Sequence, residues 1–325
     1  MVYAEIVAGL VLLVIGAELL VRGSVTLARR IGVSSLLIGL TLVGFGTSTP
    51  ELVASVTGAL KGSPGIAVGN VVGSNICNVL LILGVGALIY PLATTRRAFV
   101  RDGPALLAAS FLFLAVAWHG SLSRLVGAAF VAALAGYILY TYRTEKVHPN
   151  SSGALHSAEA EQVPALSMSW PLATLLALAG IGVLVAGAYL LVDGAIQVAR
   201  GYGISETIIG LTVVAIGTSL PELATSAVAA MRKEADVAIG NVVGSNIYNI
   251  LGILGVTALV QPIPMPPEIM AFDIWVMLAA AVLLVVFALS GLRINRWEGG
   301  LLLAGYVAYI AYLASIAGAA PASAG

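Results

Sequence analysis

The fold is decided by the stretch Gly46-Thr47-Ser48-Thr49-Pro50-Glu51-Leu52, which places a carboxylate, hydroxyls and a proline in a segment that is otherwise apolar. The pattern returns as Gly217-Thr218-Ser219-Leu220-Pro221-Glu222-Leu223, 171 residues further along the chain. Two glutamates therefore stand in matching frames of two apolar segments. A repeat of this kind indicates a chain built from two related halves.

The composition places the chain in a membrane. Of its 325 residues, 60% are hydrophobic and only 9% are charged, whereas a soluble domain carries about 25% charged residues. A charged side chain at the centre of a bilayer costs about 2.5–3.5 kcal/mol on insertion scales, so Glu51 and Glu222 indicate a functional site. The single cysteine, Cys77, excludes an internal disulfide bond.

Ten segments are apolar over about 20 residues, the length that a helix needs to cross a bilayer. We expect an all-α membrane protein with ten transmembrane helices, near residues 4–22, 34–60, 66–90, 103–118, 122–142, 170–192, 205–231, 237–260, 271–290 and 297–317. The second, third, seventh and eighth are interrupted by Gly, Ser, Thr, Asn and Pro, and are expected to be broken helices. We expect a five-helix repeat at 1–142, a flexible polar linker at 143–169 and a second five-helix repeat at 170–325.

Lysine and arginine are distributed unevenly over the two sides of these spans. The side of the N-terminus holds three, Lys61, Arg124 and Arg200, and the opposite side holds twelve. Because cytoplasmic loops carry the excess of these residues, we expect both termini outside and the 143–169 loop in the cytoplasm. We expect a multi-pass protein of a prokaryotic cell (plasma) membrane.

The repeat extends well beyond the opening motif. Residues 39–52 match residues 210–223 at ten of fourteen positions, and residues 69–78 match residues 240–249 at nine of ten. Each half has an odd number of expected spans, so the two halves insert in opposite orientations. An inverted repeat with interrupted helices in corresponding positions is typical of a secondary transporter.

The polar residues of the first motif are spaced to share one side of a helix. Thr47 and Ser48 precede Glu51 by four and three residues, and Ser55 follows it by four, the spacings at which side chains meet on a helix. Pro50 lacks an N–H and crowds the carbonyl four residues back, so the Gly46 carbonyl is expected to be free. Thr218, Ser219, Glu222 and Ser226 repeat this arrangement in the second half.

Brought together, the two motifs would supply two carboxylates, several hydroxyls, amides and free carbonyls. Ligation by oxygen alone with a flexible coordination number suits hard cations such as Ca²⁺, and Na⁺ by the same reasoning, rather than zinc or copper. Glu51 and Glu222 contribute two negative charges, which one Ca²⁺ or several Na⁺ would neutralise. The sequence therefore predicts a cation site between the halves.

GTSTPEL and GTSLPEL, each followed by GNVVGSN, resemble the two alpha-repeats of the prokaryotic sodium/calcium exchanger family, within the calcium/cation antiporter superfamily. The resemblance covers residues 1–102 and 172–273 at the level of motifs. It implies antiport of Na⁺ and Ca²⁺ by alternating access, with the two ions as substrates and no bound cofactor. Because the first and sixth helices are apolar and poor in ligands, they are candidates for the moving gate.

The resemblance also implies roles for individual residues. Glu51 and Glu222 would be the central calcium ligands, helped by the backbone carbonyls of Thr47 and Thr218. The inner sodium site would be flanked by Ser48, Ser74 and Gly44, the outer one by Ser219, Ser245 and Ala215, and the middle completed by Asn78 and Asn249. Some members of the family carry an aspartate where this chain has Asn249, so the centre here has two carboxylates.

Three alternatives remain beside the Na⁺/Ca²⁺ antiporter. An H⁺/Ca²⁺ antiporter on the same fold would use the buried glutamates to carry protons. A cation channel does not require an inverted repeat. An intramembrane enzyme with two carboxylates requires different surroundings for the pair, whereas the two motifs here are near copies. We therefore expect a transporter and not an enzyme, functional as a monomer.

Two pairs of polar residues are expected to be structural. Asn70 and Asn241 are expected to hold the broken helices together rather than to bind the ion. Asp102 and Asp273, which match in the repeat, are expected to cap the ends of spans.

Overall fold

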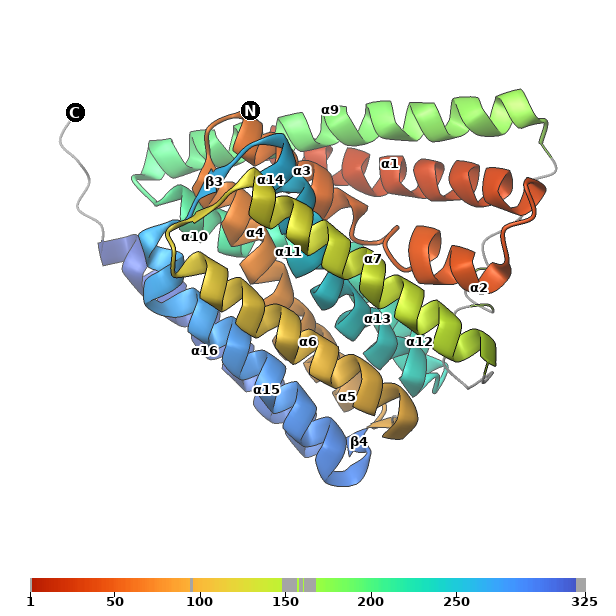
Figure 1. Ribbon diagram of the computed structural model, residues 1–325. Helices are drawn as coiled ribbons and strands as arrows, with labels where there is room; N and C mark the ends of the chain where they lie inside the picture. Colours follow the sequence, from red (N-terminus) through yellow and green to blue (C-terminus); the bar gives the residue numbers. More distant parts are fainter. Residues whose placement is uncertain (1, 94–95, 148–156, 158–159, 161–167, 320–325) are drawn as a thin grey trace.

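The computed structural model describes residues 2–93, 96–147, 157, 160 and 168–319, which form a bundle of helices (Figure 1). In this part of the chain, eight helices are long and apolar enough to cross a membrane. A ninth span consists of two helices, Glu206–Thr218 and Leu220–Met231, that are bent by 48° against each other. The expected class, an all-helical membrane protein, is therefore confirmed.

The first repeat contains seven α-helices and two π-helical segments in its described residues. They are α1 (Val2–Arg30), α2 (Ser35–Ile38), η1 (Gly39–Val43), α3 (Thr49–Leu60), α4 (Pro64–Ile76), η2 (Cys77–Ile82), α5 (Leu83–Ile89), α6 (Arg96–Ala117) and α7 (Arg124–Val147). The expected linker at 143–169 begins inside α7, and most of it lies outside the described residues.

The second repeat follows the same order. Its elements are α9 (Trp170–Tyr202), α10 (Glu206–Ile209), η3 (Gly210–Val214), α11 (Ala215–Thr218), α12 (Leu220–Met231), α13 (Ala235–Ile247), η4 (Tyr248–Leu254), α14 (Gly255–Val260), η5 (Ile269–Asp273), α15 (Ile274–Gly291) and α16 (Arg296–Ala319). Two short antiparallel pairings connect loops of the two repeats: β1 (Leu92–Ala93) with β4 (Arg293–Ile294), and β2 (Ser121–Leu122) with β3 (Ile263–Pro264).

The expected interruptions occur in corresponding places of the two repeats. The π-helical segments η1 and η3 begin at Gly39 and Gly210, and η2 and η4 begin at Cys77 and Tyr248. Single-turn π segments inside α-helices are frequent at functional sites. The second, third, seventh and eighth spans are therefore irregular, as the sequence predicts.

The expected span at 34–60 is the least regular part of the bundle and is not among the nine candidate spans. It consists of α2, η1, a turn at residues 44–48 and then α3. The turn separates two segments that are each too short to cross a bilayer alone. The equivalent span in the second repeat keeps α10, η3 and α11 continuous and breaks only at Ser219.

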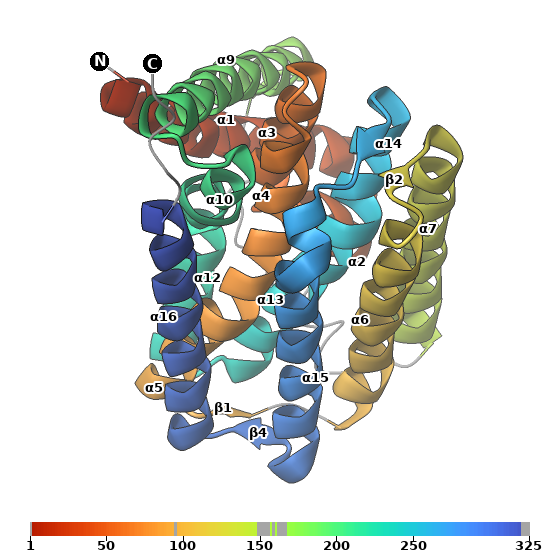
Figure 2. The ribbon, with the colours of Figure 1, turned by 90° about the vertical axis from the view of Figure 1, so that its left-hand side faces the viewer.

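The helices α1 and α9 lie side by side along one edge of the bundle (Figures 1 and 2). Glycines allow the two backbones to approach: a Cβ at Gly9 would lie 2.6 Å from the Leu191 nitrogen, and one at Gly180 would lie 2.5 Å from the Leu20 nitrogen. Small residues at a helix interface permit this close packing in a membrane. The α4–α5 and α13–α14 spans are the most buried and form the centre of the bundle.

Candidate functional site

Each motif glutamate lies in the first turn of a new helix. The helix α3 begins at Thr49 and α12 at Leu220, and each carries its proline at one of the first two helical positions. Proline suits this place, because its fixed φ fits the helix and its missing N–H would have no partner there. The carboxylates of Glu51 and Glu222 thus sit at the positive ends of the helix dipoles. Both residues are 1% exposed.

The two motifs exchange hydrogen bonds across the repeats. The Ser48 hydroxyl donates to Glu222 Oε1 at 2.7 Å, and the Ser219 hydroxyl donates to Glu51 Oε1 at 3.0 Å. Each glutamate is therefore held by a serine of the other repeat. This reciprocal pair brings both motifs to one site, as the sequence predicts.

Several oxygens of the site are buried and have no hydrogen-bond partner among the residues that the structure describes. They include one carboxylate oxygen of each motif glutamate, and they are Glu51 Oε2, Glu222 Oε2, Thr47 Oγ1, Ser74 Oγ, Asn75 Oδ1, Asn78 Oδ1 and Asn249 Oδ1. A buried polar atom without a partner costs about 1–3 kcal/mol. A bound cation would compensate for this cost, because it takes oxygen lone pairs as ligands.

The asparagines at the start of the second motif connect the helices of the site. Asn70 Nδ2 donates to the Glu51 carbonyl at 3.0 Å and to Ser55 Oγ at 2.9 Å. Asn241 Nδ2 donates to Ser226 Oγ at 3.1 Å in the other repeat. Asn70 thus connects α4 to α3, and Asn241 connects α13 to α12, which is the structural role expected for them.

The later part of the second motif lies at the junction of the α-helix and the π segment. Asn78 Nδ2 donates to Asn246 Oδ1 at 2.9 Å, whereas both amide atoms of Asn249 are buried without a partner. Asn246 Nδ2 also donates to the Asn75 carbonyl at 3.4 Å. Asn75 and Asn246 were absent from the predicted ligands, although their recurrence within GNVVGSN was a signal that could have included them.

The remaining predictions concern Ser245, Gly44, Ala215 and the Gly46 carbonyl. Ser245 Oγ lies 3.2 Å from the donating Ser48 hydroxyl. Gly44 follows η1 and Ala215 follows η3, at equivalent positions of the repeat. The expected freedom of the Gly46 carbonyl is wrong, because it accepts a bond from the Thr49 N–H at 3.3 Å. With Pro50 at the helix start, a tighter turn replaces the missing bond.

Thr47 and Thr218, the predicted carbonyl ligands, differ in their surroundings. The Thr218 hydroxyl donates to Asn70 Oδ1 at 3.1 Å and is also within bonding distance of the Val214 carbonyl, at 3.0 Å. The Thr47 hydroxyl accepts or donates no hydrogen bond within the described part of the chain, and its residue is partly exposed. The two halves of the site therefore differ in the hydrogen bonding and the exposure of these equivalent threonines.

The same asymmetry appears in the glycines of the central helices. A Cβ at Gly69 would lie 2.9 Å from the Thr207 carbonyl oxygen, and one at Gly73 would lie 2.6 Å from the Leu211 carbonyl oxygen. At the equivalent Gly240 and Gly244, no described atom lies within 4 Å of such a Cβ. The helix α4 is thus closed against α10 and η3, while α13 does not pack in the same way against α2 and η1.

The family model described as "Sodium/calcium exchanger protein" matches residues 2–143 and 172–314. The sodium/calcium exchanger MaX1 of Methanosarcina acetivorans is 35% identical, over 92% of this chain and 95% of that protein. The inner membrane protein YrbG of Escherichia coli is 35% identical, over 93% of each chain.

Among solved structures, the sodium-calcium exchanger NCX_Mj soaked with 2.5 mM Na⁺ and 0.1 mM Ca²⁺ is similar with a TM-score of 0.63. It is 33% identical in sequence, and the match covers 95% of this chain and 97% of that one. The similarity therefore extends over the whole bundle and both repeats.

Proposed function

The chain belongs to the sodium/calcium exchanger family as a multi-pass membrane cation/calcium exchanger rather than an enzyme, and from this premise we propose that it exchanges Na⁺ for Ca²⁺ by alternating access. Ions of both kinds would bind in turn at the site between the two repeats. Since one chain holds both motifs, a monomer would contain the complete site.

The observation that carries this proposal is the reciprocal pairing of Ser48 with Glu222 and of Ser219 with Glu51. It joins the two carboxylates in one buried site and leaves a free oxygen on each of them. A site of this charge and ligand type favours Ca²⁺ or several Na⁺. Competition between the two ions for the same oxygens would couple their transport.

We propose the ligand set that the resemblance of the two motifs to the family implies. Glu51 and Glu222 would hold Ca²⁺ at the centre, with the backbone carbonyls of Thr47 and Thr218. The flanking Na⁺ positions would be formed by Ser48, Ser74 and Gly44 on one side, by Ser219, Ser245 and Ala215 on the other, and the middle by Asn78 and Asn249.

The asymmetry between the repeats supports alternating access. The helix α13 begins two residues after Lys233, on the side that the charge distribution places in the cytoplasm. The open surfaces at Gly240 and Gly244 belong to this side, whereas Gly69 and Gly73 are closed on the other. The described conformation would therefore face the cytoplasm, and the opposite conformation would exchange the open and closed contacts.

A flux assay on purified protein in proteoliposomes tests the proposal. A Na⁺ gradient is expected to drive ⁴⁵Ca²⁺ uptake, and Glu51→Gln and Glu222→Gln are expected to abolish it, because each removes one of the two negative charges that would bind the ion. Glu18→Gln is the matched control, since Glu18 is exposed and pairs with Arg22 on α1 at 2.5 Å. Full flux in both site variants would refute the assignment of the ligands.

The same vesicles separate the alternatives. Ca²⁺ uptake driven by a pH gradient without Na⁺ would establish an H⁺/Ca²⁺ antiporter instead, in which the free carboxylate oxygens carry protons. Uptake without counterflow would indicate a channel. Varying Na⁺ and pH independently therefore decides the coupling ion.

A further inference from the structure

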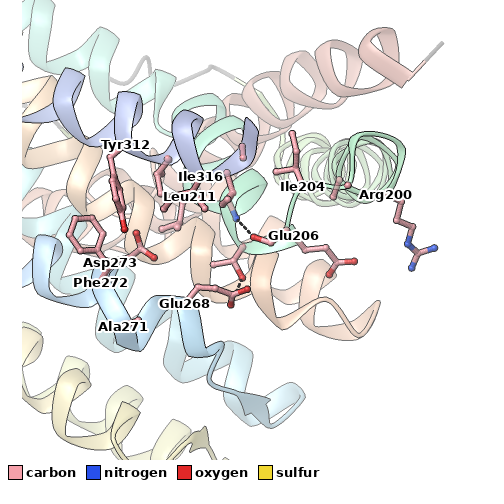
Figure 3. Close-up of a pocket in the computed structure, with 17 residues that line it drawn as sticks. Arg200, Ile204, Glu206, Leu211, Glu268, Ala271, Phe272, Asp273, Tyr312 and Ile316 are labelled. Atoms are coloured by element: carbon pink, nitrogen blue, oxygen red, sulfur yellow. Dashed lines mark hydrogen bonds between the residues drawn. The ribbon is translucent and has the colours of Figure 1, made fainter. Parts of the chain in front are cut away.

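A cavity of about 690 Å³ lies apart from the ion site, between the end of α9, α10, η5 and the end of α16 (Figure 3). Its size falls within the 300–1,000 Å³ range of sites for small organic ligands. A bare cation would fill only a small part of it, because one water molecule occupies about 30 Å³. The cavity therefore fits a ligand larger than an ion.

The inner wall of the cavity carries a buried carboxylate. Asp273 is 3% exposed, and the Tyr309 hydroxyl donates to its Oδ1 at 2.8 Å. Glu268 also lines the cavity, and its Oε2 accepts a hydrogen bond from the Thr207 hydroxyl at 3.3 Å. Burying a carboxylate without a positively charged partner is costly, so this wall favours a cationic group.

The equivalent residue of the first repeat shows what Asp273 lacks. Asp102 pairs with both Nε and Nη2 of Arg101, at 2.5 and 2.8 Å, and accepts a bond from Tyr137 at 3.0 Å. Phe272 stands in place of that arginine in the second repeat, and within the described residues Asp273 has no cationic partner. The expected capping role of Asp273 is wrong, since its side chain makes no capping bond to α15.

The rest of the cavity is largely apolar and opens towards the bilayer. Phe272, Tyr312 and Ile316 line it and are 39%, 41% and 42% exposed, at the ends of two membrane spans. The rings of Phe272 and Tyr312 lie 4.4 Å apart, beside Asp273 in Figure 3. Aromatic faces also attract cations. Arg200, the basic residue of the lining, extends away from Asp273 at the end of α9 (Figure 3).

We propose that this cavity binds the headgroup of a membrane phospholipid with a primary ammonium group, a phosphatidylethanolamine. The ammonium group pairs with Asp273 and Glu268, and the acyl chains leave over Phe272 and Ile316 into the bilayer. Charge complementarity selects this lipid, because an anionic headgroup without an amine would face the two carboxylates unpaired.

Lipid competition measured by native mass spectrometry tests the proposal on the purified full chain. The probes are phosphatidylethanolamine, phosphatidylcholine and phosphatidylglycerol with identical acyl chains. The wild-type protein is expected to prefer phosphatidylethanolamine over phosphatidylglycerol by about tenfold, as one charge-assisted hydrogen bond provides. Phosphatidylcholine keeps the positive charge but cannot donate this bond, so intermediate binding is expected.

Two variants make the test specific. Asp273→Asn keeps the shape and the Tyr309 contact but removes the charge, so it is expected to lose the preference. Tyr309→Phe keeps the charge and is expected to retain it, which separates the ammonium site from a general disturbance of α16. Equal binding of phosphatidylethanolamine and phosphatidylglycerol to the wild type would overturn the proposal, and so would an unchanged preference in Asp273→Asn. If Asp273→Asn changes only Ca²⁺ binding, the cavity is a cation site and the proposal is also wrong.

Discussion

Gly73 and Gly244 occupy equivalent positions of the two repeats but have opposite surroundings, so alanine at each should shift the transport cycle in opposite directions. At Gly73 a Cβ would lie 2.6 Å from the Leu211 carbonyl oxygen and 2.7 Å from the Ala215 Cβ. Both contacts are shorter than any normal packing distance, so α4 must move away from η3 and α11. At Gly244 the described atoms leave room for the methyl group.

The expected magnitude follows from these contacts. Overpacking by one methyl group costs about 1–3 kcal/mol, which corresponds to a change of about 5- to 150-fold in the equilibrium between two conformations. Gly73→Ala therefore destabilises the described conformation by this amount. Gly244→Ala leaves it unchanged or stabilises it through helix propensity by about 1 kcal/mol, and instead disfavours the conformation in which α13 closes against η1.

Amide hydrogen exchange without transported ions measures this shift. In Gly73→Ala, deuterium uptake at residues 206–214 is expected to rise, because α10 and η3 lose their contact with α4. In Gly244→Ala, uptake at 206–214 is expected to stay low or fall. Na⁺-driven Ca²⁺ flux should decrease in both, since each variant disfavours one half of the cycle. Exchange that changes in the same direction in both variants, or full flux in Gly244→Ala, would refute this reasoning.

Three further substitutions test the charge of the candidate ion site and a contact between α3 and α9. Asn249→Asp is expected to tighten Ca²⁺ binding by about tenfold or more in calorimetric titration. A factor of ten corresponds to roughly 1.4 kcal/mol, and an added carboxylate beside a divalent ion contributes more than this. Unchanged affinity would place Asn249 outside the ion site. Lys61 Nζ lies 2.9 Å from Asp193 Oδ1 and 3.5 Å from the centre of the Tyr189 ring, so it ties the end of α3 to α9. Lys61→Met is expected to raise hydrogen exchange around Asp193 in α9 by a small factor, because a partly exposed ion pair is worth about 0.2–1 kcal/mol. An equal effect from Asp193→Asn would confirm the pair. No change in either variant would show that the pair does not hold the helices together.

Much of the site could be predicted because its chemistry is concentrated in contiguous motifs. Glu51 and Glu222 are conspicuous in apolar segments, and the proline before each predicts an irregular helix. The structure agrees on both points, yet it places the glutamates at helix starts rather than in helix interiors. A spacing of three or four residues cannot distinguish these, since it describes only the positions that a continuous helix would bring together.

The sequence alone determined the membrane class, the two repeats and the residue types of the candidate ion site, because apolar length, motif identity and charge are properties of the chain itself. Only the tertiary structure decided which serine meets which glutamate, and it pairs Ser48 with Glu222 and Ser219 with Glu51 across the repeats. It also decided that Gly73 is enclosed while Gly244 is open. Two nearly identical motifs carry the same local preferences, so the difference between them arises from the packing of the whole bundle in one conformation.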